Sequence, residues 1–205
     1  MFIRSERLFL RPGWPEDSAE LLALIADKSV VRNLARAPWP YTADDARRFL
    51  EAPQDRLLPR FLITQPGAEG ARLLGCVGLA EIDGEVSLGY WIARDQWGQG
   101  FASEAVGAVL ALARSIGHRR IVASHFVDNP GSGRVLEKAG FERTGRIVER
   151  FSAGRGMAFP AREYALEFGE PCDCDDGGNG DGDGKAGISA SRMALPGMSA
   201  RRRAA

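Results

Sequence analysis

The chain has 205 residues, of which 44% are hydrophobic and 26% are charged, a composition that suits one globular domain with room for an appendage. Its 27 Lys and Arg residues balance 27 Asp and Glu residues, so its charge gives no reason to expect a nucleic-acid partner. Charged residues at positions 4, 6 and 7, and apolar helical runs far shorter than the ~20 residues that cross a bilayer, predict a cytoplasmic protein with no membrane partner.

The N-terminal part of the chain predicts one strand followed by two helices. Apolar residues set among Arg and Glu predict a strand over Phe2–Arg11. Pro15 is suited to the first position of a helix. Thr42 with Asp45 has the spacing of a capping box, which predicts a second helix ending near Glu51.

The middle of the chain predicts strands, a long helix and a closing pair of strands. Asp83-Gly84 is typical of a two-residue hairpin turn. We expect strands over 57–64, 72–82, 85–93, 120–127, 141–151 and 157–168, and helices over 100–116 and 130–140. This order predicts an α/β (α+β) fold, with a mixed, mostly antiparallel sheet of about seven strands and helices on both faces.

The composition changes sharply after residue 169. We expect a domain over residues 1–169 and a Gly/Asp-rich, disordered tail over 170–205. Cys172 and Cys174 stand among aspartates in that tail, but no His or second Cys pair completes a zinc site there. Cys76 falls in a predicted core strand, so no disulfide framework and no metal site is expected.

The most informative segment runs from Tyr90 to Ala105 and joins a strand, a glycine turn and a helix start. Gly98 and Gly100 permit positive φ and close approach of an anion, and the helix that follows directs free N–H groups and its positive dipole end at the same point. A P-loop would need Lys followed by Ser or Thr, and a dinucleotide fingerprint would need a third small residue and a later acid. Neither pattern fits well.

A second segment, Asp128 to Phe141, resembles the Asn-x-x-Ser…Glu-Lys-x-Gly-Phe signature of the GNAT acetyltransferases. The stretches Arg4–Pro12 and Trp39–Thr42 are similar to the branch that contains ribosomal-protein-alanine N-acetyltransferases. The resemblance covers about the first 168 residues, in the family's order. It implies the GNAT fold, with central strands that splay apart to admit the acyl-pantetheine arm, and acetyl-CoA as cosubstrate.

The resemblance also implies the residues that hold the coenzyme. Amides of the glycine loop would bind the pyrophosphate, so the departure at Asp95, where relatives often carry Gln or Arg, leaves backbone capture intact. The expected coenzyme contacts are Ile92, Gln96, Trp97, Gly98, Gln99, Gly100, Phe101, Ala102, Ser103, Asn129 and Ser132. Simple helix capping is the alternative interpretation of Asn129 and Ser132.

The resemblance implies direct attack of an amine on the thioester, with no covalent enzyme intermediate. Ser132 would protonate the departing thiolate. Many relatives carry a glutamate base where this chain has Ser87, which leaves Glu81, His125, Glu149 or a water chain as candidates. Glu81 could equally face solvent beside its turn, and His125 could equally be a core histidine.

Three further residues are candidate contacts for the acceptor: Trp39, Tyr41 and Tyr90. The predicted function is an N-acetyltransferase for a primary amine, either a protein N-terminus or a small molecule, acting as a monomer or homodimer. A non-catalytic acyl-CoA sensor or scaffold is the alternative that the Ser87 departure keeps open. A nicotinamide oxidoreductase is the weakest of the three, because the ribose-binding acid is missing.

Overall fold

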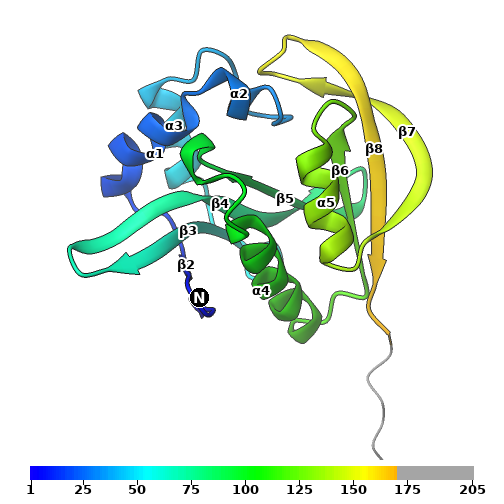
Figure 1. Cartoon of the computed structure of the whole chain (residues 1–205), viewed down its shortest axis with the longest axis horizontal. Helices are drawn as coiled ribbons and strands as arrows, with labels where there is room; N and C mark the ends of the chain where they lie inside the picture. Colours follow the sequence, from blue (N-terminus) through cyan, green and yellow to red (C-terminus); the bar gives the residue numbers. More distant parts are fainter. Residues whose placement is uncertain (170–205) are drawn as a thin grey trace, which may run out of the picture. The chain divides into compact units, whose positions relative to one another are not determined.

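The computed structural model describes residues 1–169 (Figure 1). The tail, with Cys172 and Cys174, lies outside the described residues. The helices are η1 (Pro15–Asp17), α1 (Ser18–Ile25), α2 (Lys28–Val31), α3 (Ala43–Glu51), η2 (Arg94–Gln96), α4 (Phe101–Ser115) and α5 (Pro130–Lys138). The strands are β1 (Ile3–Arg4), β2 (Phe9–Arg11), β3 (Arg60–Gly67), β4 (Gly70–Ile82), β5 (Glu85–Ile92), β6 (Arg120–Phe126), β7 (Glu142–Ser152) and β8 (Met157–Glu167).

These strands form one eight-stranded sheet in the order β1-β2-β3-β4-β5-β6-β8-β7. Every neighbouring pair is antiparallel except β5 and β6, which confirms the mixed, mostly antiparallel sheet predicted from the sequence. The eighth strand arises because the expected first strand is broken in two. A turn closed by the Ser5 N–H, which donates to the Leu8 carbonyl at 3.0 Å, separates β1 from β2.

A hairpin turn and a helix cap that the sequence predicts both have the expected geometry. Asp83 and Gly84 both have positive φ, 54° and 79°, which is the conformation of a two-residue type I′ hairpin between β4 and β5. Thr42 and Asp45 form a complete capping box at the start of α3. Helix α2 is absent from the sequence-based expectation because a single helical turn is too short to show a period.

Helices cover both faces of the sheet, as predicted. Helices α4 and α5 pack on one face, where Val106, Val109 and Leu136 join Val77 and Leu88 of the central strands in one apolar cluster. Helices α1, α2 and α3 pack on the other face, where a second cluster contains Leu21, Val31, Leu50, Leu62, Leu73 and Trp91. Alternation along each strand sends neighbouring side chains to opposite clusters, so both faces of the central strands are buried.

The central strands β5 and β6 separate along their length. Their parallel ladder has two residue pairs, Ser87 with Val122 and Leu88 with Ala123, and ends there. Beyond Leu88, β5 continues to Ile92 without a ladder partner on this side. The sheet therefore opens toward the C-terminal ends of β5 and β6, beside the starts of α4 and α5. Within residues 1–169 no helix combines the length and apolar character needed to cross a membrane.

Candidate active site

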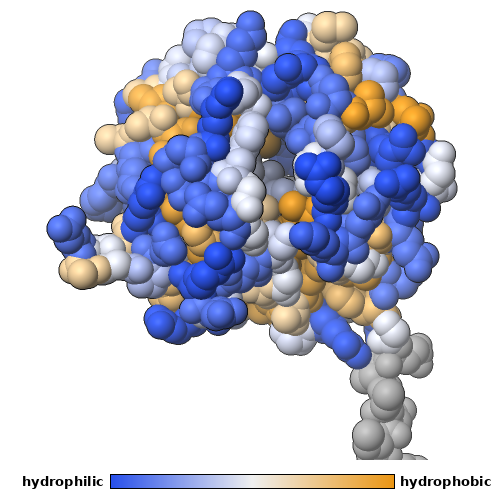
Figure 2. Space-filling model, viewed as in Figure 1, coloured by the Kyte–Doolittle hydropathy of each residue, from blue (hydrophilic) through white to orange (hydrophobic). Residues whose placement is uncertain are grey.

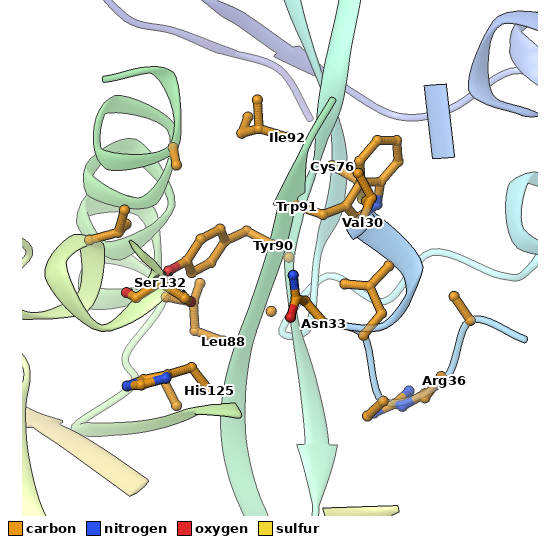
Figure 3. A pocket seen from close by; sticks show the side chains of 18 of the residues that line it. Val30, Asn33, Arg36, Cys76, Leu88, Tyr90, Trp91, Ile92, His125 and Ser132 are labelled. Atoms are coloured by element: carbon orange, nitrogen blue, oxygen red, sulfur yellow. Dashed lines mark hydrogen bonds between the residues drawn. The ribbon is translucent and has the colours of Figure 1, made fainter. Parts of the chain in front are cut away.

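A cavity of about 940 Å³ lies at this opening and extends along both sides of β5. Figure 3 shows Tyr90, Ser132 and His125 on one side of β5, and Asn33, Arg36 and Trp91 on the other. We call the first side the α5 half and the second side the α2 half. Figure 2 shows the surface hollowed near its centre, with hydrophilic residues around the rim. The cavity therefore passes through the sheet where β5 and β6 separate, with one half on each side of β5.

The glycine loop between η2 and α4 forms one end of the α5 half. Gly98 and Gly100 have φ of 79° and 82°, values that favour glycine, and Gly100 is the N-cap of α4 without any side-chain cap. A Cβ atom at Gly98 would meet nothing within 4 Å, so the space above the loop is open. The first N–H groups of α4 are therefore free to bind an anion.

Most of the loop residues singled out from the sequence line the cavity. They are Gln96, Trp97, Gly98, Gly100, Phe101, Ala102 and Ser103, together with Ile92. Gln99 does not line it, because its side-chain amide donates to the Asp95 carbonyl and to Gln96 Oε1. The structure thus assembles one continuous loop wall, with the Gln99 side chain turned along the loop.

Sequence reasoning missed the residues that support this loop. Glu104, in the first turn of α4, accepts hydrogen bonds from Ser5 Oγ (2.7 Å), the Arg7 N–H (2.7 Å) and Arg7 Nε (2.8 Å). Arg7 also donates to the Gln99 carbonyl at 3.1 Å and lies over the Phe101 ring. Burial alone raises the pKa of Glu104, but the bonds from Arg7 and Ser5 outweigh it and leave the pKa below its usual range.

The free edge of β5 presents backbone groups to the α5 half. The Ala93 N–H donates to the Leu74 carbonyl on β4, so alternation directs the N–H and C=O groups of Tyr90 and Ile92 to the opposite edge, where the ladder with β6 has ended. The indole N–H of Trp97 donates to the Ile92 carbonyl at 2.7 Å. The Ile92 N–H is therefore the group at this edge best placed to bind an extended ligand.

Tyr90 and Ser132 meet across the gap between β5 and α5. Their hydroxyl oxygens are 2.7 Å apart, and the Tyr90 hydroxyl is also 3.0 Å from the Ser132 carbonyl oxygen (Figure 3). Burial raises the pKa of Tyr90 to about 12, so its hydroxyl keeps its proton at neutral pH. Tyr90 lines the cavity with its ring in the α5 half, and its contact with the acceptor stays a prediction.

Asn129 performs the capping role considered from the sequence and also lines the cavity. Its side-chain oxygen accepts from the Ser132 N–H at 3.4 Å at the start of α5. The two interpretations of Asn129 and Ser132 are therefore compatible, because the cap fixes the helix start that places the Ser132 hydroxyl in the cavity.

His125 is held from both of its ring nitrogens. Nδ1 is 2.8 Å from the Phe126 carbonyl and therefore donates to it, while Nε2 is 3.3 Å from the Tyr164 hydroxyl. A Cβ atom on Gly133 would lie 2.7 Å from Nε2, so α5 packs directly against the ring. This geometry fits the interpretation of His125 as a satisfied core histidine at the cavity wall, and a proton relay through His125 stays a prediction.

The remaining candidates lie away from the opening. Glu81 and Glu149 are exposed and border an outer hollow that adjoins the cavity, but they do not line the cavity itself. Trp39 is 41% exposed and does not line the cavity. Tyr41 does line the α2 half, where burial raises its pKa to about 12. No described residue therefore supplies a carboxylate base directly at the splayed strands, consistent with the serine at position 87.

The turn between β7 and β8 docks against the segment that follows α2. Ser152 Oγ donates to the Leu34 carbonyl at 2.9 Å and the Ala153 N–H donates to the Ala35 carbonyl at 2.9 Å. Arg155 binds Asp128 through both terminal nitrogens, at 2.9 and 2.8 Å, and Arg32 adds a third contact at 2.6 Å. Figure 1 shows this hairpin arching over toward α2. Segments far apart in the sequence thus dock together beside the α2 half.

The family model described as an acetyltransferase (GNAT) domain matches residues 7–142. The N-acetyltransferase p20 of Bacillus licheniformis is 30% identical over 170 residues, covering 79% of this chain and 93% of that protein. A GNAT-family acetyltransferase from Bacillus anthracis has a TM-score of 0.70 at 25% identity, covering 82% of this chain and 98% of that one. RimL, a ribosomal alpha-N-protein acetyltransferase in complex with coenzyme A, has a TM-score of 0.67 at 20% identity, with coverage of 82% and 98%.

The family match spans the glycine loop, the splayed strands and α5, which are the elements that build the cavity. Within residues 1–169 no group of three or more His, Cys, Asp or Glu side chains could hold a metal ion. The chain belongs to the GNAT acetyltransferase family and is an acetyl-CoA-dependent N-acetyltransferase.

Proposed function

We propose that this enzyme moves the acetyl group of acetyl-CoA to a primary amine by direct attack, with both substrates bound at once. The observation that carries the proposal is the cavity itself, which has a glycine loop at one end and continues past β5 into a second enclosed space. A donor and an acceptor bound in the two halves would meet where β5 and β6 separate. Such placement converts a bimolecular reaction into an effectively unimolecular one.

The donor occupies the α5 half. The pyrophosphate lies at the free amides of Gly98 to Ser103, where the positive end of α4 favours negative charge. The pantetheine arm runs along the free edge of β5 and pairs with the Ile92 N–H. Arg134 and Lys138 of α5 also line the cavity and add positive charge for the coenzyme's phosphates. The RimL structure, which holds coenzyme A in the same fold, supports this assignment.

The acceptor occupies the α2 half, beside Asn33, Tyr41 and Trp91. The amine must be neutral to attack, because an ammonium ion has no lone pair. With no cavity carboxylate at the splayed strands, water carries this proton away. The negative charge that develops on the thioester oxygen is stabilised by a backbone N–H at the edge of β5.

The chemical step balances without a covalent enzyme intermediate. The amine nitrogen forms a bond to the acetyl carbon, the carbon–sulfur bond breaks, and the coenzyme leaves as a thiolate. The nitrogen loses a proton to water as the amide forms, and that proton reaches the thiolate, whose pKa is ~8.5 by analogy with cysteine, through the Tyr90–Ser132 hydroxyl pair. Because the Tyr90 pKa is raised to about 12, the pair stays protonated overall: it passes a proton to the sulfur only as it regains one from water.

Calorimetry with acetyl-CoA, followed by thiol release against a panel of primary amines, tests the proposal. Gly100→Val should abolish binding, because positive φ and the coenzyme both exclude a branched side chain there. Gly107→Ala, a helical glycine of α4 with open space around it, is the matched control and should bind normally. Normal binding by Gly100→Val would refute the loop assignment. Tight binding without thiol release from any primary amine would refute the proposed transfer.

A further inference from the structure

The α2 half carries an excess of positive charge. Arg36, Arg48, Arg60 and Arg150 line it, whereas Asp45 is the sole cavity-lining carboxylate within residues 1–169. Asp45 is already committed, because it caps α3 through Thr42 and pairs with Arg48. The other three arginines have no further carboxylate within the cavity lining, although Arg36 and Arg150 also border the outer hollow, where Glu81, Asp83 and Glu149 lie.

Arg150 is the unusual member of this group. Its Nε is the single buried side-chain nitrogen or oxygen without a hydrogen-bond partner among the described residues. Its side chain is 27% exposed, and one terminal nitrogen donates to Glu163 at 3.1 Å. An unpaired buried donor on a charged group is costly. A bound group would reach the exposed part of this guanidinium rather than the buried Nε.

The local charge count shows what kind of partner fits. Glu163 is shared with Arg146, whose Nε lies 3.3 Å from its other oxygen. Two guanidinium groups thus neutralise one carboxylate, and one positive charge is left over. A neutral carbonyl would satisfy the hydrogen bond but not the charge, whereas a carboxylate satisfies both and matches guanidinium geometry.

The position of Arg150 sets where that carboxylate sits. Arg150 lies on β7, two strands from β6 in the sheet order, which is ~10 Å at the usual strand spacing. Its side chain reaches back into the cavity, and Arg36 faces the same space from the segment after α2 (Figure 3). A group bound there belongs to the acceptor, because the coenzyme arm lies on the other side of β5.

We infer that the acceptor carries a carboxylate near its amine and that Arg150 is the residue that selects for it. The inference rests on the proposed function, since it assigns the α2 half to the acceptor. Two sources share this chemistry: a free amino acid, and a peptide N-terminus followed by an acidic residue.

Matched pairs of amines measure this selectivity by thiol release. The first pair is a free amino acid and the corresponding amino acid amide. The second pair is two dipeptide amides that differ only in their second residue, which is Glu in one and Gln in the other. We expect kcat/KM to be higher for the carboxylate member by about tenfold or more, mainly through KM. A preference in the first pair identifies a free amino acid, and a preference confined to the second identifies a peptide.

Variants assign the preference to Arg150. Arg150→Gln should remove it by lowering kcat/KM for the carboxylate member alone, and Arg150→Lys, which keeps the charge without the planar donor, should restore it partly. Arg146→Gln is the control, because Arg146 shares Glu163 but does not line the cavity. Acetyl-CoA affinity and thermal melting confirm that each variant folds.

Three outcomes would overturn the inference: equal turnover of both members by the wild type, an equal loss for both members in Arg150→Gln, or loss of the preference in Arg146→Gln. Each of these requires measurable turnover. Binding of acetyl-CoA without turnover of any amine would instead refute the proposed function.

Discussion

The support of the glycine loop by Glu104 can be tested through Glu104→Gln. The substitution keeps one oxygen for Ser5 Oγ and the Arg7 N–H, but it places an amide donor against Arg7 Nε, where the carboxylate accepted at 2.8 Å. One charge-assisted hydrogen bond and the ion pair are lost. The Glu104 side chain is 15% exposed and that of Arg7 is 42% exposed, so solvent screens part of the interaction.

A hydrogen bond to a charged group contributes ~1.5–3 kcal/mol, and after the discount for exposure we expect Glu104→Gln to lower the free energy of unfolding by ~1–2 kcal/mol. For a domain of this size that corresponds to a fall in Tm of ~2–8 °C. Acetyl-CoA affinity should also fall, because Arg7 would no longer hold the Gln99 carbonyl and Phe101 in place.

The pH dependence follows from the lowered pKa of Glu104. A carboxylate whose pKa is depressed on folding contributes stability above its unfolded pKa and loses it as pH falls through the folded pKa. The Tm difference between wild type and Glu104→Gln should therefore be full at neutral pH and shrink on acidification. Thermal melts across pH and calorimetry with acetyl-CoA measure both effects.

Asp95→Asn is the matched control, because it removes an ion pair with Arg72 from the same loop at a site where both side chains are more than half exposed. It should change stability by less than ~1 kcal/mol. Equal Tm values for Glu104→Gln and wild type at neutral pH, or a difference that grows on acidification, would show that the loop does not depend on this carboxylate.

Two further substitutions test the groups around the opening. Tyr90→Phe removes the hydroxyl that lies 2.7 Å from Ser132 Oγ, so kcat should fall roughly tenfold to a hundredfold while the affinity for acetyl-CoA is unchanged. Adding Ser132→Ala to this variant should lower kcat little further. An unaltered kcat in Tyr90→Phe would show that other groups protonate the thiolate. His125→Ala should lower stability by ~1–3 kcal/mol by leaving Tyr164 and the Phe126 carbonyl without the ring, yet retain the shape of the pH–rate profile. Loss of one limb of the pH–rate profile in His125→Ala would instead show that His125 relays protons.

The amino-acid sequence alone determined the local features of this protein. Asp83-Gly84, the Thr42 capping box and the Gly98–Gly100 turn depend on the backbone preferences of a few consecutive residues, so their structures could be predicted without knowing the rest of the fold. The two family-like segments predicted the fold class and the coenzyme loop for the same reason, since each motif is contiguous in the chain.

The tertiary structure decided which distant residues share the site. Tyr90 meets Ser132 of α5, Glu81 lies at an outer hollow, and Arg7 from the β1–β2 turn holds Glu104 of α4. Arg150 reaches the cavity from β7, with a buried nitrogen that only packing could reveal. Such pairings depend on strand register and on how the β7–β8 turn docks against the segment after α2, and these are set by long-range packing that no local pattern encodes.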